Sequence, residues 1–288
     1  MENPIPDCLG NEELLALPAT AFLCSRRIDD EAWTAIRHWV HRIDDRGGCV
    51  RCGCLSPAER FAARLLMERG VPLVLVLAEA LPVDAAEVSR RLPDLRLSEA
   101  MGAGRLLVVS VNPDAESVAP TGANAEARNR WMMDTAERIV VAYARPYGKL
   151  DCQTVGHPRV TRLVEAAPPP HPTEKQRTNL AWGIYHSLRR HAQELSSTDL
   201  RRLLHRYLQL DTARPSLLHS LVLRFVVQER ERLHGLNFPA FLHLWGPGNL
   251  RPEDWEPSTA EGNTLSSLAD RVRALLGPEN ENLLDGET

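Results

Sequence analysis

Three short segments combine arginine, asparagine, serine or glycine in patterns that could bind phosphate. In the first, Ser25 and Arg26 directly follow the apolar run 19–24. An arginine can form two parallel hydrogen bonds with a phosphate group, and a serine hydroxyl can donate another. In the alternative interpretation, Ser25 caps the next turn and Arg26 is solvated. So short a motif does not decide between the two.

The second segment, 47–57, leads from an apolar stretch through a turn containing Gly53 into the start of a helix. Ser56 is the expected N-cap, followed by Pro57 at the first helical position and Glu59 at the third. Backbone N–H groups at a turn of this kind can cradle a phosphate. The segment lacks the Gly-Lys-Ser/Thr of a Walker A loop and a complete Gly-x-Gly-x-x-Gly, so it does not identify a nucleotide-binding family by itself.

Three of the six cysteines lie in this segment, at Cys49, Cys52 and Cys54. A structural zinc site needs four ligands, and the sequence has no second cysteine pair to complete one. Residues three apart on a strand also point to opposite faces, which separates Cys49 from Cys52. We therefore expect no metal and no other cofactor. The scattered cysteines favour a reducing, cytoplasmic environment.

The third segment is Arg128-Asn129-Arg130, which follows a proline-containing loop and lies near the start of an expected helix. An asparagine flanked by two arginines can bind a phosphate or the edge of a base. The commoner outcome for two arginines alone is a solvated helix surface.

Apolar and amphipathic stretches alternate through the first half of the chain. The expected strands are 19–24, 49–52, 71–77, 105–111 and 138–143, and the expected helices are 29–46, 57–70, 84–92 and 124–137. This alternation predicts an α/β domain with a parallel sheet. Any ligand is then expected at the carboxyl ends of the strands.

A proline cluster at 168–172 predicts a linker after the α/β domain, which we place at residues 1–168. Beyond it the strand signals fade, and apolar residues recur at helical spacing. The expected helices are 173–194, 197–208, 217–233, 238–245 and 265–276. The sequence thus predicts an α-helical C-terminal domain, 173–288, with an acidic tail.

Charge is distributed unevenly along a chain whose formal net charge is -4. Residues 171–251 contain twelve Lys or Arg against six Asp or Glu, whereas 252–288 contain two against nine. The overall balance excludes a uniformly basic surface but not a local basic face. The apolar content is too high for a disordered chain, and no apolar run is long enough to span a bilayer. The first residues lack the pattern of a signal peptide.

The basic block places arginine and histidine on successive expected helices, among them His186, Arg189 and Arg190, with Trp182 and Tyr185 nearby. Such a face could follow a phosphate backbone. The commoner alternative is a helical bundle with a solvated basic face and aromatic residues in its core.

The order of these features resembles the DNA-processing protein A (DprA/Smf) family over about residues 10–150. The resemblance is carried by Phe-Leu-Cys-Ser-Arg after the first strand, by Gly-Gly-Cys-Val with the following Gly and Ser-Pro, and by Val-Pro-Leu-Val-Leu-Val-Leu. It continues with Arg-Leu-Leu-Val-Val-Ser and with Asn-Arg before Ala-Glu-Arg-Ile-Val-Val-Ala-Tyr. It implies a Rossmann-like domain of the SLOG superfamily that binds single-stranded DNA in a basic pocket at the strand ends. It also implies a homo-oligomer such as a dimer.

By position, the resemblance implies binding residues in all three segments. They are Ser25, Arg26, Arg51, Gly53, Ser56, Arg128, Asn129 and Arg130. The usual turn of the family, Ser-Gly-x-Ala-x-Gly-Ile-Asp, here lacks the second glycine and the acid, which indicates a divergent branch. The winged helix often appended to the family does not match residues 151–288.

The sequence contains no Pro-Gly-Gly-x-Gly-Thr-x-x-Glu loop, which the hydrolase branch of the superfamily requires, and no nucleophile elbow. We therefore expect a binding protein rather than an enzyme. Its partner would be single-stranded DNA, in DNA processing, recombination or defence against foreign DNA. One alternative is a nucleotide-ligand sensor that uses the same pocket and signals through the helical domain, which could also hold a protein partner. Another is a scaffold with a degenerate pocket.

Overall fold

A computed structural model describes residues 7–43, 47–111, 122–167 and 172–208. The chain divides into two compact units. The first comprises Met1–Gln153 with Arg159–Pro168, and the second comprises Thr154–Pro158 with Pro169–Thr288.

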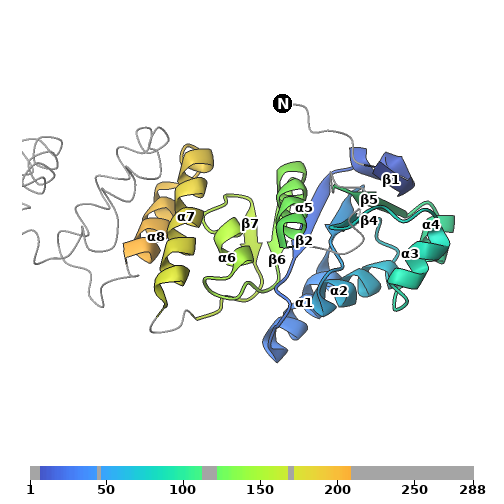
Figure 1. The fold of residues 1–288 in the computed structure, drawn as a ribbon, viewed down its shortest axis with the longest axis horizontal. Helices are drawn as coiled ribbons and strands as arrows, with labels where there is room; N and C mark the ends of the chain where they lie inside the picture. Colours follow the sequence, from blue (N-terminus) through green and yellow to red (C-terminus); the bar gives the residue numbers. More distant parts are fainter. Residues whose placement is uncertain (1–6, 44–46, 112–121, 168–171, 209–288) are drawn as a thin grey trace, which may run out of the picture. The chain divides into compact units, whose positions relative to one another are not determined.

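The first unit is built on one seven-stranded sheet (Figure 1) with the order β1-β5-β4-β3-β2-β6-β7. The strands are β1 Asp7–Gly10, β2 Ala19–Leu23, β3 Cys49–Cys52, β4 Leu73–Leu77, β5 Leu106–Ser110, β6 Arg138–Val141 and β7 Val160–Arg162. All neighbouring pairs are parallel except β1 with β5, which is antiparallel. Every residue of β3, β4 and β5 is buried, as expected for strands covered on both faces. The predicted α/β class is confirmed.

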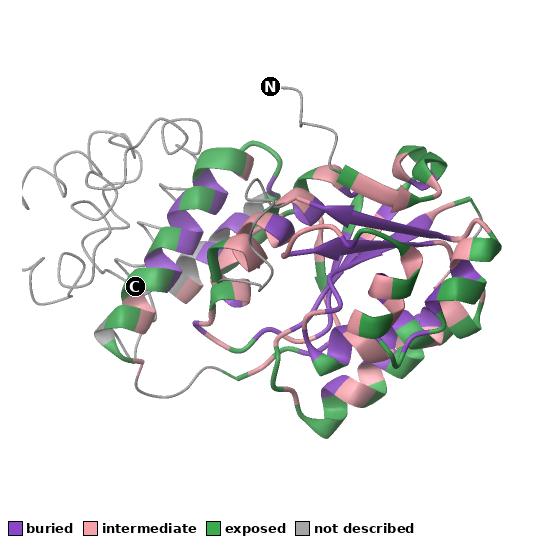
Figure 2. Ribbon diagram, turned by 45° about the vertical axis from the view of Figure 1, so that its right-hand side comes forward, coloured by how far each residue is buried: buried purple, intermediate pink, exposed green. Residues whose placement is uncertain are grey.

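Helices cover both faces of this sheet (Figure 2). The elements are a short 3-10 helix η1 Glu12–Ala16, then α1 Asp30–Arg42, α2 Pro57–Glu68, α3 Ala85–Arg91, α4 Leu97–Gly102, α5 Gly122–Thr135 and α6 Lys149–Thr154. Side chains of α1 to α4 form one buried core with one face of the strands. Those of η1 and α5 form a second core with the other face. Cys49 lies in the second core and Cys52 in the first, so the predicted separation of these cysteines is confirmed.

Local sequence signals explain where the best-defined helices begin. Helix α2 starts with a capping box in which the Ser56 hydroxyl accepts a hydrogen bond from the Glu59 N–H at 3.1 Å. Asp29 caps α1 by accepting from Ala32 N at 2.9 Å. The sequence does not predict β1, η1, α4, α6 or β7, because elements of three to six residues carry too few positions to show a period.

Arginines cap the carboxyl end of α5 from neighbouring elements. Arg51 of β3 donates to Thr135 O at 2.7 Å and also to Leu15 O at 3.2 Å. Arg159 donates to Ala136 O, and to Met133 O at 3.1 Å. These donors satisfy carbonyl groups that have no partner within the helix and lie at the negative end of its dipole.

The second unit is described as two helices, α7 Glu174–His191 and α8 Ser197–Leu208. Thr173 and Gln176 form a capping box at the start of α7. The helices predicted beyond residue 208 lie outside the described residues. None of the described helices combines the length and the apolar character that crossing a bilayer requires.

Candidate functional site

The sheet reverses its order of connection between β2 and β6. Chain order runs outward from β2 through β3 and β4 to β5, and β6 then pairs with the opposite edge of β2. In open α/β sheets, ligands bind outside the carboxyl ends of the strands at such a switch point. The segments that follow β2, β3 and β6 are therefore where a ligand site is expected.

Ser25 joins the two strands at this switch point. Its N–H donates to Tyr143 O at 2.9 Å, and its hydroxyl oxygen accepts from Arg145 N at 3.0 Å. Arg26 is the next residue after Ser25, and Arg145 is the residue whose N–H bonds to the Ser25 hydroxyl. Both arginine side chains are exposed. Two exposed arginines therefore belong to hydrogen-bonded chain segments at the same edge of the sheet.

The turn after β3 already holds an anion of its own. The Glu59 carboxylate accepts hydrogen bonds from Leu55 N at 2.8 Å and Ser56 N at 3.0 Å, both through Oε2. Glu59 is 2% exposed, so these contacts are closed off from solvent. The backbone cradle predicted for a phosphate is therefore occupied by a side chain of the protein itself.

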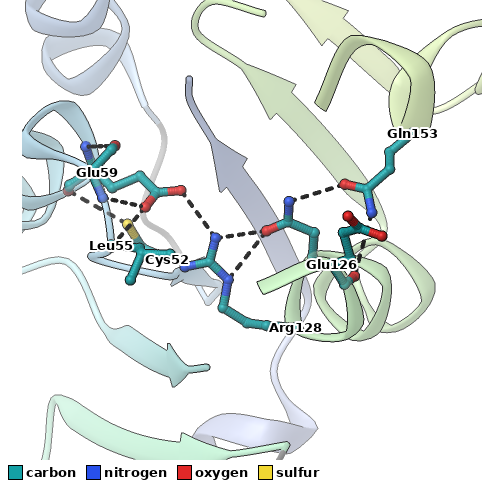
Figure 3. Close-up of polar contacts among 8 residues, drawn as sticks. Cys52, Leu55, Glu59, Glu126, Arg128 and Gln153 are labelled. Atoms are coloured by element: carbon teal, nitrogen blue, oxygen red, sulfur yellow. Dashed lines mark hydrogen bonds and ion pairs between the residues drawn. The ribbon is translucent and has the colours of Figure 1, made fainter. Parts of the chain in front are cut away.

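A buried arginine faces this carboxylate across the edge of the sheet (Figure 3). Arg128 Nη2 lies 3.5 Å from Glu59 Oε1, and both side chains are almost fully buried. The guanidinium rests directly on Gly53, since a Cβ atom added there would lie 1.7 Å from Arg128 Nη1. Arg128 Nη1 is buried and has no hydrogen-bond partner. The glycine is required here because any side chain would displace the arginine.

The network continues from Arg128 into α6 (Figure 3). Asn129 Oδ1 accepts from Arg128 Nη2 at 2.7 Å and from Nε at 3.2 Å. Asn129 Nδ2 donates to Gln153 Oε1 at 3.1 Å. Lys149 pairs with Glu126 on the exposed side of the same helices. Side chains from α2, α5 and α6 are thereby linked at one edge of the sheet.

The structure brings together Gly53, Ser56, Arg128 and Asn129 in this network, and places Ser25 and Arg26 at the adjoining strand end. Arg130 lies elsewhere. Helix α5 begins at Gly122, so the Arg128–Arg130 segment occupies its middle rather than its start. Residues two apart on a helix are about 200° apart. Arg128 therefore faces the sheet, whereas Arg130 is exposed on the outer side.

Arg51 has a structural environment. It is 4% exposed, donates to the two carbonyl groups described above, and its guanidinium lies 5.2 Å from the centre of the Trp131 ring. Burial lowers its pKa. Its side chain packs between β3 and α5, so Arg51 is not counted among the DNA-contacting residues.

Sequence reasoning missed three residues of this region: Glu59 as an internal anion, Arg145 and Gln153. The sequence signal for Glu59 is its place as the third helical residue of a capping box that begins at Ser56. Two non-glycine residues with positive φ, Cys54 at 51° and Tyr147 at 58°, also lie in turns at this edge. Strain of this kind is concentrated at functional sites.

Three buried thiols lie beneath the turn. Burial, with a smaller contribution from the charge of Glu59, raises the pKa of Cys24 to about 12. A hydrogen bond with Cys52, together with burial, raises the pKa of Cys54 well above its ordinary value. Cys24 and Cys54 therefore stay protonated at neutral pH and act as small packing groups. Within the described ranges, no group of three or more His, Cys, Asp or Glu side chains could hold a metal ion.

These observations define an α/β protein with a polar network at the switch point of its sheet. No protein-family model matches the sequence, and no curated protein matches it. Among solved structures, it is similar to DNA processing protein A (DprA) from Streptococcus pneumoniae, with 20% identity and a TM-score of 0.39 over 48% of this chain and 46% of that one. It is also similar to DprA from Helicobacter pylori, a structure concerned with the single-stranded DNA binding mode of that protein. The identity there is 16% and the TM-score 0.37, over 49% and 62% of the two chains. The chain therefore matches less than two thirds of either protein, and both belong to the family that the sequence motifs resemble.

Proposed function

We propose that the carboxyl edge of the sheet binds single-stranded DNA through exposed arginine side chains. Arg26 and Arg145 would contact phosphates at the switch point, with the backbone of both segments fixed by the hydrogen bonds of Ser25. The role would be in DNA processing, recombination or defence against foreign DNA. The order of sequence motifs that resembles the DprA family supports the same proposal.

The observation that carries this proposal is that carboxylates of the protein accept backbone N–H groups at three helix starts at this edge, within the described residues. Asp29 occupies the start of α1, Glu59 the turn before α2, and Asp151 the turn before α6, where it accepts from Tyr147 N at 2.8 Å. A nucleotide sensor of the cradle type uses such free N–H groups for its phosphates. With these donors occupied, we expect side chains to supply phosphate contacts, which is how proteins bind the backbone of nucleic acids without reading sequence.

The remaining predicted residues have supporting roles in this proposal. Gly53 and Ser56 shape the turn, while Arg128 and Asn129 fix α5 and α6 against it. Arg130, on the outer side of α5, would add a phosphate contact if the strand continues around that helix. Because Arg128 is buried, it positions its neighbours rather than contacting DNA.

The test is a titration of fluorescently labelled oligo-dT by the full chain, followed by anisotropy at two or more salt concentrations. We expect Arg26→Ala and Arg145→Ala each to weaken binding about tenfold at low salt, the effect of one charge-assisted hydrogen bond. Each variant should also reduce the slope of log K against log salt by about 0.7, the value for one phosphate contact on a single strand.

Arg138→Ala is the matched control. Arg138 is an exposed arginine of β6 at its amino end, whereas Arg145 follows the carboxyl end of the same strand. The proposal predicts wild-type affinity for this variant. Equal losses in all three variants would mean a diffuse charge effect, and unchanged binding by Arg26→Ala and Arg145→Ala would place the site elsewhere. A protein that binds a mononucleotide with little salt dependence would instead be a sensor.

A further inference from the structure

The outer face of α7 carries an aromatic group that the proposed site does not use. Its inner face is apolar and buried, with Leu180, Ile184 and Leu188 at helical spacing. Trp182 belongs to the other side and is 39% exposed. Of the large hydrophobic residues in the described ranges, only Val83 is exposed to a comparable or greater degree. Tryptophan is enriched at interfaces, because its ring offers a large apolar surface and its N–H a hydrogen-bond donor.

The rings around Trp182 are arranged as a small platform. Its ring stacks on His186, one turn further along, with centroids 5.2 Å apart and an angle of 20° between the planes. Tyr185 meets the Trp182 ring edge-on at 5.7 Å and 78°. Arg189 lies 5.9 Å from the Tyr185 ring and donates to the Tyr185 hydroxyl at 3.2 Å. These contacts hold the platform in one geometry, which lowers the entropy cost of binding a ligand on it.

Positive charge lies at both ends of this face. Lys175 is exposed near the start of α7, and Arg189 and Arg190 are exposed near its end. Apart from Glu174 at its first position, α7 has no acidic residue. At 1.5 Å per residue, the two ends are about 21 Å apart, with the stacked rings between them. The face therefore combines a planar aromatic surface with flanking cations.

We propose that this face of α7 is a second contact for single-stranded nucleic acid. A base would stack on the Trp182–His186 pair, while Lys175 and Arg190 would contact phosphates on either side. Base stacking on an aromatic side chain and electrostatic contact with the backbone are the two interactions that sequence-independent single-strand binders combine. The positive charge favours a polyanion over an apolar protein segment. The proposal does not depend on the site at the switch point.

The test uses the full chain and single-stranded oligonucleotides that carry 5-bromouracil for photo-crosslinking. We expect crosslinks to map by mass spectrometry to the peptide that contains Trp182. In anisotropy titrations, Trp182→Ala should weaken binding about fivefold or more, the lower end of the range measured for loss of one stacked base. Trp182→Phe should recover part of the affinity because it keeps an aromatic ring. Arg190→Ala should reduce the salt slope by about 0.7.

Val83→Ala is the matched control, since it removes a more exposed apolar side chain from the first unit. It should bind as the wild type does. Wild-type affinity of Trp182→Ala together with the absence of crosslinks on α7 would overturn the proposal, even if Arg26 and Arg145 prove necessary. Crosslinks at Trp182 that persist in an Arg26→Ala/Arg145→Ala variant would support it even if the switch-point site fails. If Trp182→Ala does not fold, Trp182→Phe and the crosslinks of the wild type still decide.

Discussion

The buried pair between Arg128 and Glu59 allows a quantitative test of how this edge of the sheet is held together. Their charged groups lie 3.5 Å apart, and the side chains are only 4% and 2% exposed. Removing one partner of a buried ion pair costs about 3–5 kcal/mol, because the other charge remains buried without compensation. In Arg128→Met the glutamate keeps its hydrogen bonds from Leu55 N and Ser56 N, so the lower end, about 3 kcal/mol, is expected.

For a unit of this size, a loss of about 3 kcal/mol corresponds to a fall in Tm of about 6–12 °C. Glu59→Gln should cost a similar amount by leaving Arg128 buried and unpaired. Both backbone N–H groups converge on Oε2 of Glu59, and the amide oxygen of a glutamine can replace that atom. The double variant Glu59→Gln/Arg128→Met removes both charges. It should therefore lie within about 1 kcal/mol of the wild type.

Urea unfolding followed by circular dichroism would give the free energies of all four proteins as a double-mutant cycle. Two single losses of about 3 kcal/mol each and a double variant within about 1 kcal/mol of the wild type give an expected coupling energy of about 5–7 kcal/mol. The reasoning is refuted if Arg128→Met is as stable as the wild type. It is refuted equally if the double variant loses the sum of the two single losses, because the two groups would then act independently.

Three further predictions concern single residues. Arg51→Ala leaves two carbonyl groups without a hydrogen-bond donor, at a cost of about 1–3 kcal/mol each. Urea titration should therefore show a loss of at least about 2 kcal/mol in the free energy of unfolding. An unchanged midpoint would contradict the capping role. Gly53→Ala should lower Tm in thermal unfolding, since its Cβ would overlap the Arg128 guanidinium. Gly102→Ala is the control, because no atom lies within 4 Å of a Cβ added at that position. The pKa of Cys24 rises from 9.0 to about 12 on folding, so the folded protein binds this proton more tightly. The free energy of unfolding should then fall above pH 9, by at most about 1.4 kcal/mol per pH unit. In Cys24→Ala this fall should be shallower. Equal pH dependence of stability in the variant and the wild type would argue against the raised pKa.

The central strands and the start of α2 could be predicted because their signals are local. Cys49–Cys52 is short but is bounded by glycines, and Ser56 with Glu59 forms a capping box within four residues. The short edge elements could not, since β7 has three residues and gains its structure from pairing with β6. Hydrophobic period and capping depend on neighbours in sequence, whereas edge pairing depends on the rest of the sheet.

The candidate site was only partly accessible from sequence for the same reason. Ser25 and Gly53 were found because a motif surrounds each of them. Whether an arginine faces the sheet or the solvent depends on the helix phase, which the sequence left open at Arg128 and Arg130. That the Glu59 carboxylate bonds to the turn depends on tertiary structure, since the same sequence would allow it to point to solvent.

The middle and the carboxyl end of α5 are held by different kinds of contact, and this has a consequence for local opening. At its carboxyl end, Arg51 and Arg159 donate to backbone carbonyl groups. At its middle, the helix is held by side-chain contacts of Arg128 and Asn129. Amide hydrogens near Thr135 should therefore exchange with deuterium only on global unfolding, whereas those of the first turns should exchange through smaller openings. DNA bound at the switch point should therefore change the exchange rates of the first turns of α5 before it changes those near Thr135.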